Sequence, residues 1–379
     1  MEEKEKPVTK VVSLKKLTRS QYPDFSDKLD KAGLIDAIEQ SLIYFSRIPG
    51  TKKFYFGKDI FTGAHIKKSL TKFLSFIKKE PSQKELNNFV RDNYAVYKSP
   101  GRDDKEKVLF TGYYEPSLAG SLTRDAQYRY PLYSEPDDLL TINLKLFSDR
   151  YREEPKLLAR VDKNNNIVPY YSRQEINAIE NFEERAQPVA WVKSRTDRFF
   201  LEIQGSGKVL LKQGDFLRVH YHRKNGRKYR SIGKVLIDKK EIAREDISMQ
   251  SIRAWLENNP LKAEEVFNYN PSFVFFKKEE KGPLGCLGVK VTPMRSIATD
   301  RSLFPKGSLC FIETFIPLKN KTKKTDTWKK YSGFVLNQDA GGAIKGPGRT
   351  DFFYGNGGYA EFAAGHMNHP GNLYFLVLK

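Results

Sequence analysis

The sequence lacks the residue patterns that stabilise disulfide-rich or zinc-binding proteins and that span membranes. Only Cys286 and Cys310 are cysteines, which excludes a disulfide framework and a cysteine-based zinc site but leaves a single bridge between the two open. No run of about 18 apolar residues occurs, so we expect no membrane-spanning helix. The polar start MEEKEKPVTK lacks an apolar targeting core, which leaves either a cytosolic protein or one whose export signal has been removed.

Histidine is also scarce, with five in the chain. His220 and His222 alternate along an expected strand, and His366 and His369 lie three positions apart. Neither pair has an Asp or Glu spaced to complete the three or four ligands of a metal site. We therefore expect no metal and no other cofactor.

Several catalytic and binding motifs are missing. The segment around Ser206 lacks the first glycine of a Gly-x-Ser-x-Gly elbow, and Lys345 is followed by Gly346 rather than by the Ser or Thr of a phosphate loop. The interleaved Phe and Gly of an RNA-recognition motif are absent as well. Among the kinds of chemistry considered, these absences leave carboxylate chemistry.

The overall composition indicates a folded protein with a basic surface. Its length suits about two domains, and 26 Phe and 20 Tyr favour β structure. The net charge of +20 predicts an acidic partner, which could be nucleic acid, an anionic membrane surface or an acidic polysaccharide. Charge alone does not choose among them.

Hydrophobic spacing predicts helices in the N-terminal third and strands thereafter. Amphipathic helices are expected at 30–48 and 63–79, and Ser82 with Glu85 forms a capping box for a third. We expect residues 1–20 to be poorly ordered and 319–330 to form a basic surface loop. The β-rich middle reads as an inserted domain in an α+β or mainly β protein.

Within that middle, residues 191–211 alternate apolar and polar side chains up to Gly205 and resume at Val209, which predicts a β-hairpin. Gln204 and Ser206 would lie at its turn, where they suit hydrogen bonding to sugar hydroxyls or amides. A plain hairpin turn explains the same spacing. A further helix is expected at 248–259, closed by Pro260.

The glycine-rich stretch 339–357, DAGGAIKGPGRTDFFYGNG, is the strongest candidate for an active site. Its glycines permit tight turns and a close approach to a ligand. Asp351 is followed by Phe352, Phe353 and Tyr354, and apolar neighbours favour a carboxyl that keeps its proton, as general acid catalysis requires. Asp339 is the local candidate for a second carboxylate, although turn acids also cap backbone amides.

Many ordered motifs closely resemble the membrane-bound lytic murein transglycosylase A family. They cover roughly residues 108–379: TGYYEP, YPLY, PYYSRQEI, FFLEIQGSG, SIGKVL, MQSIRAWL, NPSFVFF, LGVKVTPMRSIATD, DAGGAIKGPGRTDFFYGNG and AGHMNHPG.

The resemblance implies a double-psi β-barrel domain with a helical N-terminal part, formed by 1–118 and 284–379. It implies a second β-barrel domain inserted at 119–283 and a groove between the two that holds a glycan. Both the barrel and the insertion agree with the helical start and the β-rich middle of the sequence.

The resemblance also implies cleavage of the β-1,4 bond between N-acetylmuramic acid and N-acetylglucosamine in peptidoglycan, without water, leaving a 1,6-anhydromuramoyl end. The family's catalytic acid falls on Asp351, and Asp339 matches a supporting aspartate. A third aspartate found in many relatives would fall near Gly358 and is absent here. By motif position, the residues expected to bind substrate are Thr111, Tyr113, Tyr114, Gln204, Ser206, Gly341, Gly342 and Lys345.

The implied partners are peptidoglycan glycan strands, with no nucleic acid. The implied setting is the periplasm, at the outer membrane, for a monomer with a lipid anchor on its native N-terminus. Two alternatives stay open at this point: a module that binds peptidoglycan or another anionic polymer without cutting it, and a nucleic-acid-binding protein.

Overall fold

The computed structural model describes residues 14–27, 30–102, 106–151, 156–318 and 327–379. The chain divides into two compact units. The first consists of Met1–Tyr113, Gly285–Gly355 and His366–Lys379, and the second of Tyr114–Leu284 and Asn356–Gly365. The domain limits predicted at 118/119 and 283/284 stay a prediction.

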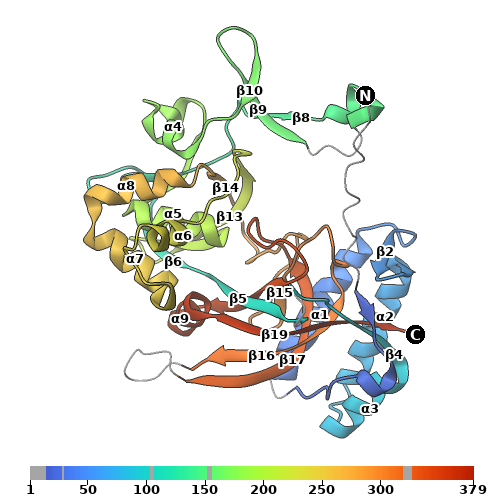
Figure 1. The fold of residues 1–379 in the computed structure, drawn as a ribbon. Helices are drawn as coiled ribbons and strands as arrows, with labels where there is room; N and C mark the ends of the chain where they lie inside the picture. Colours follow the sequence, from blue (N-terminus) through green and yellow to red (C-terminus); the bar gives the residue numbers. More distant parts are fainter. Residues whose placement is uncertain (1–13, 28–29, 103–105, 152–155, 319–326) are drawn as a thin grey trace, which may run out of the picture. The chain divides into compact units, whose positions relative to one another are not determined.

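The first unit contains a closed β-barrel (Figure 1). Strands β19, β16, β17, β15, β18 and β5 are hydrogen-bonded in that order, and β5 pairs again with β19, so the ring has no free edge. Beyond the ring, β4 continues from β19 and β1 from β4. The strands of this unit are β1 Lys15–Lys16, β2 Lys53–Phe56, β3 Asp59–Thr62, β4 Tyr94–Lys98, β5 Val108–Glu115, β15 Ser296–Ala298, β16 Leu309–Pro317, β17 Trp328–Asp339, β18 Arg349–Asn356 and β19 Asn368–Leu378.

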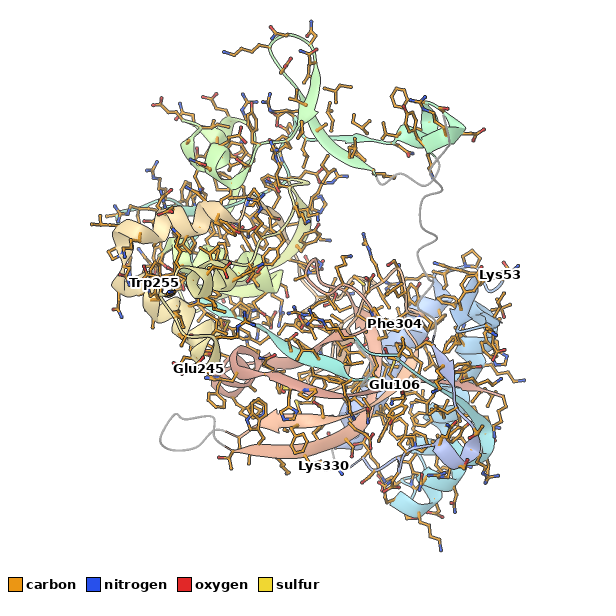
Figure 2. The ribbon with its side chains drawn as sticks, viewed as in Figure 1. Lys53, Glu106, Glu245, Trp255, Phe304 and Lys330 are labelled. Carbon is orange, nitrogen blue, oxygen red and sulfur yellow. The ribbon has the colours of Figure 1, made fainter. Side chains whose placement is uncertain are left out.

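The N-terminal helices of this unit form as predicted. They are α1 Lys31–Ser46, α2 Gly63–Ile77 and α3 Gln83–Asn93, and Ser82 caps α3 through the predicted capping box. Their apolar faces join an aromatic core in which Phe73 of α2 meets Phe334 of β17 at a ring-centroid distance of 5.0 Å. In the same unit, Phe304, which is labelled in Figure 2, stacks on Phe375 of β19 with ring centroids 5.0 Å apart.

The second unit is built on a six-stranded sheet in the order β14-β13-β12-β6-β11-β7. Every one of these strands contributes to a single hydrophobic cluster, so the sheet curls around one core. Its strands, together with the three strands of a smaller sheet, are β6 Ser117–Ser121, β7 Tyr130–Tyr133, β8 Leu140–Ile142, β9 Leu157–Val161, β10 Ile167–Pro169, β11 Pro188–Val192, β12 Ser206–Leu211, β13 Phe216–Lys224 and β14 Val274–Lys278.

Helices accompany this sheet in the second unit. They are α4 Arg173–Ala178, α5 Arg195–Gln204, α6 Ile232–Asp238, α7 Met249–Asn258, α8 Pro260–Tyr269 and α9 Gly358–His366. Short 3₁₀ turns in the two units are η1 Arg19–Gln21, η2 Leu144–Leu146, η3 Asp149–Tyr151, η4 Phe182–Glu184 and η5 Arg244–Asp246. Ser172 caps α4 and Ser248 caps α7, and α7 matches the helix predicted at 248–259.

The predicted hairpin at 191–211 is wrong, because its first half is helix α5. Ser194 accepts a hydrogen bond from the Asp197 amide and begins the helix, and Gly205 ends it at a φ of +80°. The residues from Phe199 to Glu202 are all buried, which no alternating strand exposed on one face would show. The helix buries both faces because it lies between two hydrophobic clusters.

Other predictions need smaller corrections. Pro260 does not simply end a helix, since it is the first residue of α8. Residues 1–13 and 319–326 lie outside the described residues. The rest of those two segments is ordered, with β1 paired to β4 and Trp328 opening β17. Within the described part of the chain, no helix combines the length and apolar character that crossing a membrane needs.

Candidate active site

Three neighbouring strands of the barrel bring the two predicted acids together. Strand β15 lies between β17 and β18, and its residue Ala298 pairs with Asp339 on one side and with Asp351 on the other. Two strand spacings separate the acids, so their Cα atoms lie roughly 10 Å apart. The register of β15 with β17 shifts just before Ala298, and the two carboxyls nevertheless lie near each other, because the charge of Asp339 acts on Asp351 and both act on Tyr113.

Asp351 lies in surroundings that favour its neutral form. The pKa of Asp351 is raised to about 6, chiefly by burial and also by the negative charge of Asp339, while the Arg349 guanidinium acts in the opposite direction. Thr111 of β5 donates a hydrogen bond to the Asp351 carboxyl. The side chain is nevertheless partly exposed. An acid enclosed by protein but reachable from solvent can meet a bound molecule.

Asp339 is held by the backbone. Its Oδ1 accepts hydrogen bonds from the amides of Cys286 and Ala340, both at 2.8 Å. Burial raises the pKa of Asp339 to about 6, and these two amides pull it down. Asp339 therefore caps backbone amides, as one of the two roles considered for it requires, and its charge also acts on Asp351.

Tyr113 lines the same site. Its ring packs on Phe353 with centroids 5.0 Å apart, and Phe353 lies two residues after Asp351 on β18. Burial raises the pKa of Tyr113, and the nearby Asp339 carboxylate raises it further. The hydroxyl has no hydrogen bond of normal geometry with the described residues. The hydroxyl oxygen is buried, and its interaction with the Asp339 carboxyl lowers the pKa of that acid.

The two acids are chemically alike and differ in what supports their charge. Asp339 accepts two backbone amides, which stabilise a carboxylate, whereas the hydrogen bond to Asp351 comes from a single neutral hydroxyl. When the pair carries one proton, the carboxylate thus belongs on Asp339 and the proton on Asp351. The arrangement places a partly exposed carboxyl, Asp351, near a second carboxyl, Asp339, that two backbone amides hold.

The glycine-rich loop between β17 and β18 follows Asp339 directly. A Cβ on Gly341 would approach Ile344 to 2.7 Å, while one on Gly342 would meet open space. Lys345 is exposed on this loop. The loop is anchored at Gly346, whose amide donates to Asp300 at 2.9 Å. The loop therefore exposes backbone at Gly342 and one cation, Lys345, whose charge acts on Asp300.

The remaining predicted residues, Tyr114, Gln204 and Ser206, belong to the second unit. The Gln204 side-chain oxygen accepts the Tyr114 amide at 3.0 Å, so it is not a free acceptor. The Tyr114 hydroxyl donates to Glu361 at 3.3 Å. Ser206 begins β12 instead of occupying the predicted hairpin turn.

Two residues near the acids were not predicted from the sequence. Cys286 supplies an amide to Asp339 from a separate stretch of chain, and nothing in its local sequence signals that contact. Arg349 acts on Asp351 through its charge, and its position two residues away on a strand could have suggested this. Cys286 and Cys310 are both free, so the bridge left open by the sequence is not formed.

The part of the chain that the structure describes contains no group of three His, Cys, Asp or Glu side chains arranged to hold a metal ion.

Two family models match the sequence. The MltA specific insert domain matches residues 109–277, and the 3D domain matches residues 295–377. Among curated relatives, membrane-bound lytic murein transglycosylase A of Escherichia coli K12 is 34% identical over 77% of this chain and 72% of its own length. The protein of the same description from Vibrio cholerae is 31% identical over 74% of this chain and 68% of its own.

Solved structures agree over nearly the full length. A membrane-bound lytic murein transglycosylase from Agrobacterium tumefaciens has a TM-score of 0.77 and 26% identity, covering 97% of this chain and 98% of that one. The Escherichia coli protein solved with bound chitohexaose has a TM-score of 0.70 and 26% identity, covering 97% and 95%. Together with the closed barrel, these similarities confirm the predicted fold class, a double-psi β-barrel with a second inserted β domain.

Proposed function

The chain belongs to the membrane-bound lytic murein transglycosylase A family, and from this we propose that it is a peptidoglycan lytic transglycosylase. It cleaves the β-1,4 bond between N-acetylmuramic acid and N-acetylglucosamine and leaves 1,6-anhydromuramoyl ends. The observation that carries the proposal is a partly exposed carboxyl, Asp351, whose pKa is raised to about 6 beside a second acid.

Asp351 acts first as acid and then as base in this mechanism. Its proton passes to the glycosidic oxygen as that oxygen leaves C1 of the muramoyl sugar, and positive charge develops at C1. The muramoyl 6-hydroxyl then bonds to C1 and gives its proton to Asp351, which restores the starting state. An attacking group within the same sugar has a high effective concentration, so one acid suffices and no second carboxylate has to activate water.

Asp339 supports this cycle without transferring a proton. Its fixed negative charge keeps the Asp351 proton in place at rest and lies near the sugar as positive charge develops. Thr111 orients the Asp351 carboxyl, and Tyr113, whose ring packs on Phe353, is proposed to line the sugar site. Gly341, Gly342 and Lys345 contribute exposed backbone and one cation to glycan binding.

In the second unit, Tyr114, Gln204 and Ser206 are proposed to contact the glycan. Gln204 can do so through its amide nitrogen, because its oxygen already accepts the Tyr114 amide. Ser206 is partly exposed at the start of β12.

We further propose that the protein works as a monomer in the periplasm, with a lipid anchor at the outer membrane. The family name of the relatives, which describes membrane-bound enzymes, supports a location in the cell envelope. The Escherichia coli relative solved with bound chitohexaose supports glycan strands, rather than nucleic acid, as the partner.

Mass spectrometry of peptidoglycan digests tests the proposal. The protein should release 1,6-anhydromuramoyl products, and Asp351→Asn should reduce their rate of release by about 10²–10⁴-fold, the usual contribution of a general acid. Asp215→Asn is the matched control, since Asp215 is exposed and distant in sequence from both acids. Reducing ends in place of anhydro ends would make the protein a hydrolase.

The same variant separates an enzyme from a binding module. A module that only grips the wall would bind peptidoglycan in a pull-down equally well with or without Asp351→Asn and would release no soluble fragments in either form. Full wall-clearing activity in Asp351→Asn would remove Asp351 from the mechanism.

A further inference from the structure

The second unit contains a pocket of about 510 Å³ that the proposed mechanism does not use. Such a volume is typical of small-ligand sites. Its walls come from the segment before β7, from β7 and β11, from the start of α5, and from α4 with the turn that follows it. All of these elements belong to the second unit.

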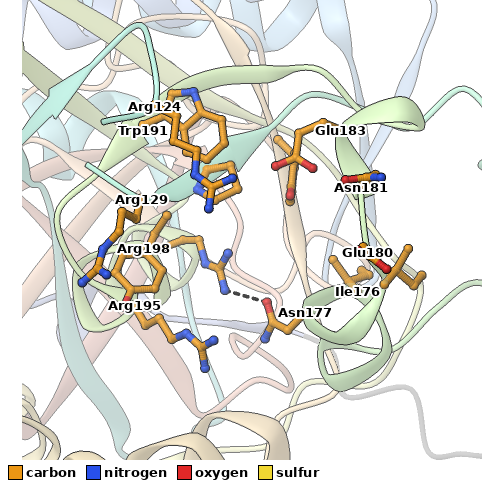
Figure 3. Close-up of a pocket in the computed structure, with 14 residues that line it drawn as sticks. Arg124, Arg129, Ile176, Asn177, Glu180, Asn181, Glu183, Trp191, Arg195 and Arg198 are labelled. Carbon is orange, nitrogen blue, oxygen red and sulfur yellow. Dashed lines mark hydrogen bonds between the residues drawn. The ribbon is translucent and has the colours of Figure 1, made fainter. Parts of the chain in front are cut away.

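The two sides of the pocket carry opposite charges (Figure 3). Four arginines lie on one side, and Glu180 and Glu183 lie on the other. The arginines are Arg124, Arg129, Arg195 and Arg198.

Arg198 forms the buried base of the positive side. Its side chain is 5% exposed, and its Nη2 donates to Asn177 of α4 at 2.7 Å. Its Nε has no hydrogen-bond partner among the described residues. The nearest carboxylate is that of Glu202, at 3.8 Å from this Nε, and Arg173 already binds Glu202 through two nitrogens. This buried cluster thus contains two guanidinium groups, of Arg173 and Arg198, and one carboxylate, that of Glu202.

An anion bound in the pocket would offset this surplus positive charge. Burial, together with the charges of Arg173 and Arg195 and against that of Glu202, lowers the pKa of Arg198 to about 10. A carboxylate in the pocket would compensate part of this positive charge.

The other charged residues of the pocket differ in how far they are paired. Arg195 forms an ion pair with Glu264, so its charge is already balanced. Arg129 is exposed and makes no hydrogen bond or ion pair with the residues that the structure describes. Arg124 is exposed as well, but its guanidinium lies over the Trp191 ring, so Arg129 is the exposed arginine of the pocket without a hydrogen bond, ion pair or ring contact to the described residues.

An aromatic residue lies between the charges. The Tyr133 hydroxyl interacts with Glu183, and the charges of Arg198 and Arg124 also act on it. Trp191 lines the pocket beneath Arg124, whose guanidinium lies 5.7 Å from the ring centroid. The pocket thus offers a cationic side, an anionic side and aromatic surface, which suits a ligand that carries charges of both signs.

We propose that this pocket binds the zwitterionic amino-acid end of a peptide, with ammonium and carboxylate on the same carbon. Arg129 and Arg198 take the carboxylate, and Glu183 opposite takes the ammonium group. That the peptide is a stem of peptidoglycan rests on the proposed function, whereas the recognition of the amino-acid end rests on the pocket alone.

Titration with Nε-acetyl-lysine, followed by NMR or calorimetry, tests the proposal because this probe presents a free amino-acid end on a chain. Blocking its carboxylate as the amide, or its ammonium by Nα-acetylation, should each weaken binding about tenfold or more. Arg129→Gln should weaken binding of the free probe by a similar factor, whereas Lys163→Gln, an exposed change outside the pocket, should not. Glu183→Gln should weaken binding of the free probe but not of the Nα-acetylated one.

Several outcomes would overturn the proposal. Equal binding of the free and amidated probes, or an unchanged affinity in Arg129→Gln, would exclude carboxylate recognition. Inorganic phosphate bound as tightly as the probe would reduce the site to a general anion site.

Competition by purified muropeptides distinguishes the two sources of such an end. Stems with a free amino-acid end should displace the probe; if they do not, the ligand is a free amino acid and the assignment to wall peptides is wrong. Cleavage of peptide-free glycan is measured separately. Its loss with probe binding intact would refute the proposed function and leave the pocket assignment standing.

Discussion

Asp339 and Asp351 are identical carboxylic acids that the barrel places in different surroundings. Both have a pKa raised to about 6 by burial. Two backbone amides hold Asp339, whereas a hydroxyl and the more distant charge of Arg349 act on Asp351. Because the pair titrates as a coupled unit, the local hydrogen bonds decide which carboxyl keeps the proton.

The pH dependence of cleavage should report this arrangement. Asp351 must be protonated to act, so kcat/KM should fall as pH rises through its pKa, near 6 in the unmodified protein. Asp339→Asn removes a negative charge that raises this pKa, so the falling limb should move to lower pH. Arg349→Gln removes a positive charge that lowers it, so the limb should move to higher pH.

Initial rates measured across pH 4–8 with one soluble glycan substrate would provide all three profiles. Opposite displacements are the diagnostic result, because general damage to the fold would lower the plateau without moving the limb in two directions. Limbs that stay in place in both variants would contradict the assignment of the titrating group to Asp351.

At the scale of elements, helix α5 is fixed to its unit by a buried ion pair. Glu202 of α5 binds Arg173 of α4, and the two side chains are 1% and 2% exposed. Arg173 also donates to the carbonyls of Asn270 and Ser272 just before β14. One guanidinium therefore ties two helices to the start of a strand.

Breaking this pair should destabilise the protein strongly. Glu202→Gln leaves the buried guanidinium of Arg173 without its counter-charge, which costs about 3–5 kcal/mol in free energy of unfolding. Glu257→Gln is the matched control, because its i,i+4 pair with Arg253 is exposed and contributes less than about 0.5 kcal/mol. Urea denaturation of both variants provides the comparison, and similar midpoints would show that the pair does not hold α5.

At the scale of the whole molecule, the chain carries a net charge of +20. The barrel unit contains both acids, and the second unit contains the arginine-rich pocket. A positive field of this size attracts anionic polymers and is screened by salt. The charge by itself left three kinds of acidic partner open, and the proposed function selects the wall polymer.

Ionic strength should therefore affect charged and uncharged substrates differently. Raising salt from about 0.05 to 0.5 M should increase KM for peptidoglycan several-fold, because screening weakens the long-range attraction. Binding of chitohexaose, an uncharged glycan seen in a relative, should change little. Equal salt effects on the two ligands would show that the net charge plays no part in recruiting the substrate.

Local sequence signals predicted the elements whose burial follows their own pattern. The N-terminal helices and the cap at Ser82 fit, because one face of each is apolar and the caps lie next to the residues they serve. The segment 195–204 was misjudged as a strand because it is buried on more than one side, which removes the period that separates helix from strand.

The sequence by itself determined the glycine-rich turn, the apolar neighbours of Asp351 and the motifs of the family, since each depends on residues close together in the chain. Only the tertiary structure decided that the Cys286 amide donates to Asp339 and that Ala298 pairs with both acids. It also decided that the start of α5, the turn after α4 and the segment before β7 bring arginines and glutamates to one pocket. These contacts join residues far apart in sequence. Strand register and buried charge set them, and neither can be seen in a local pattern.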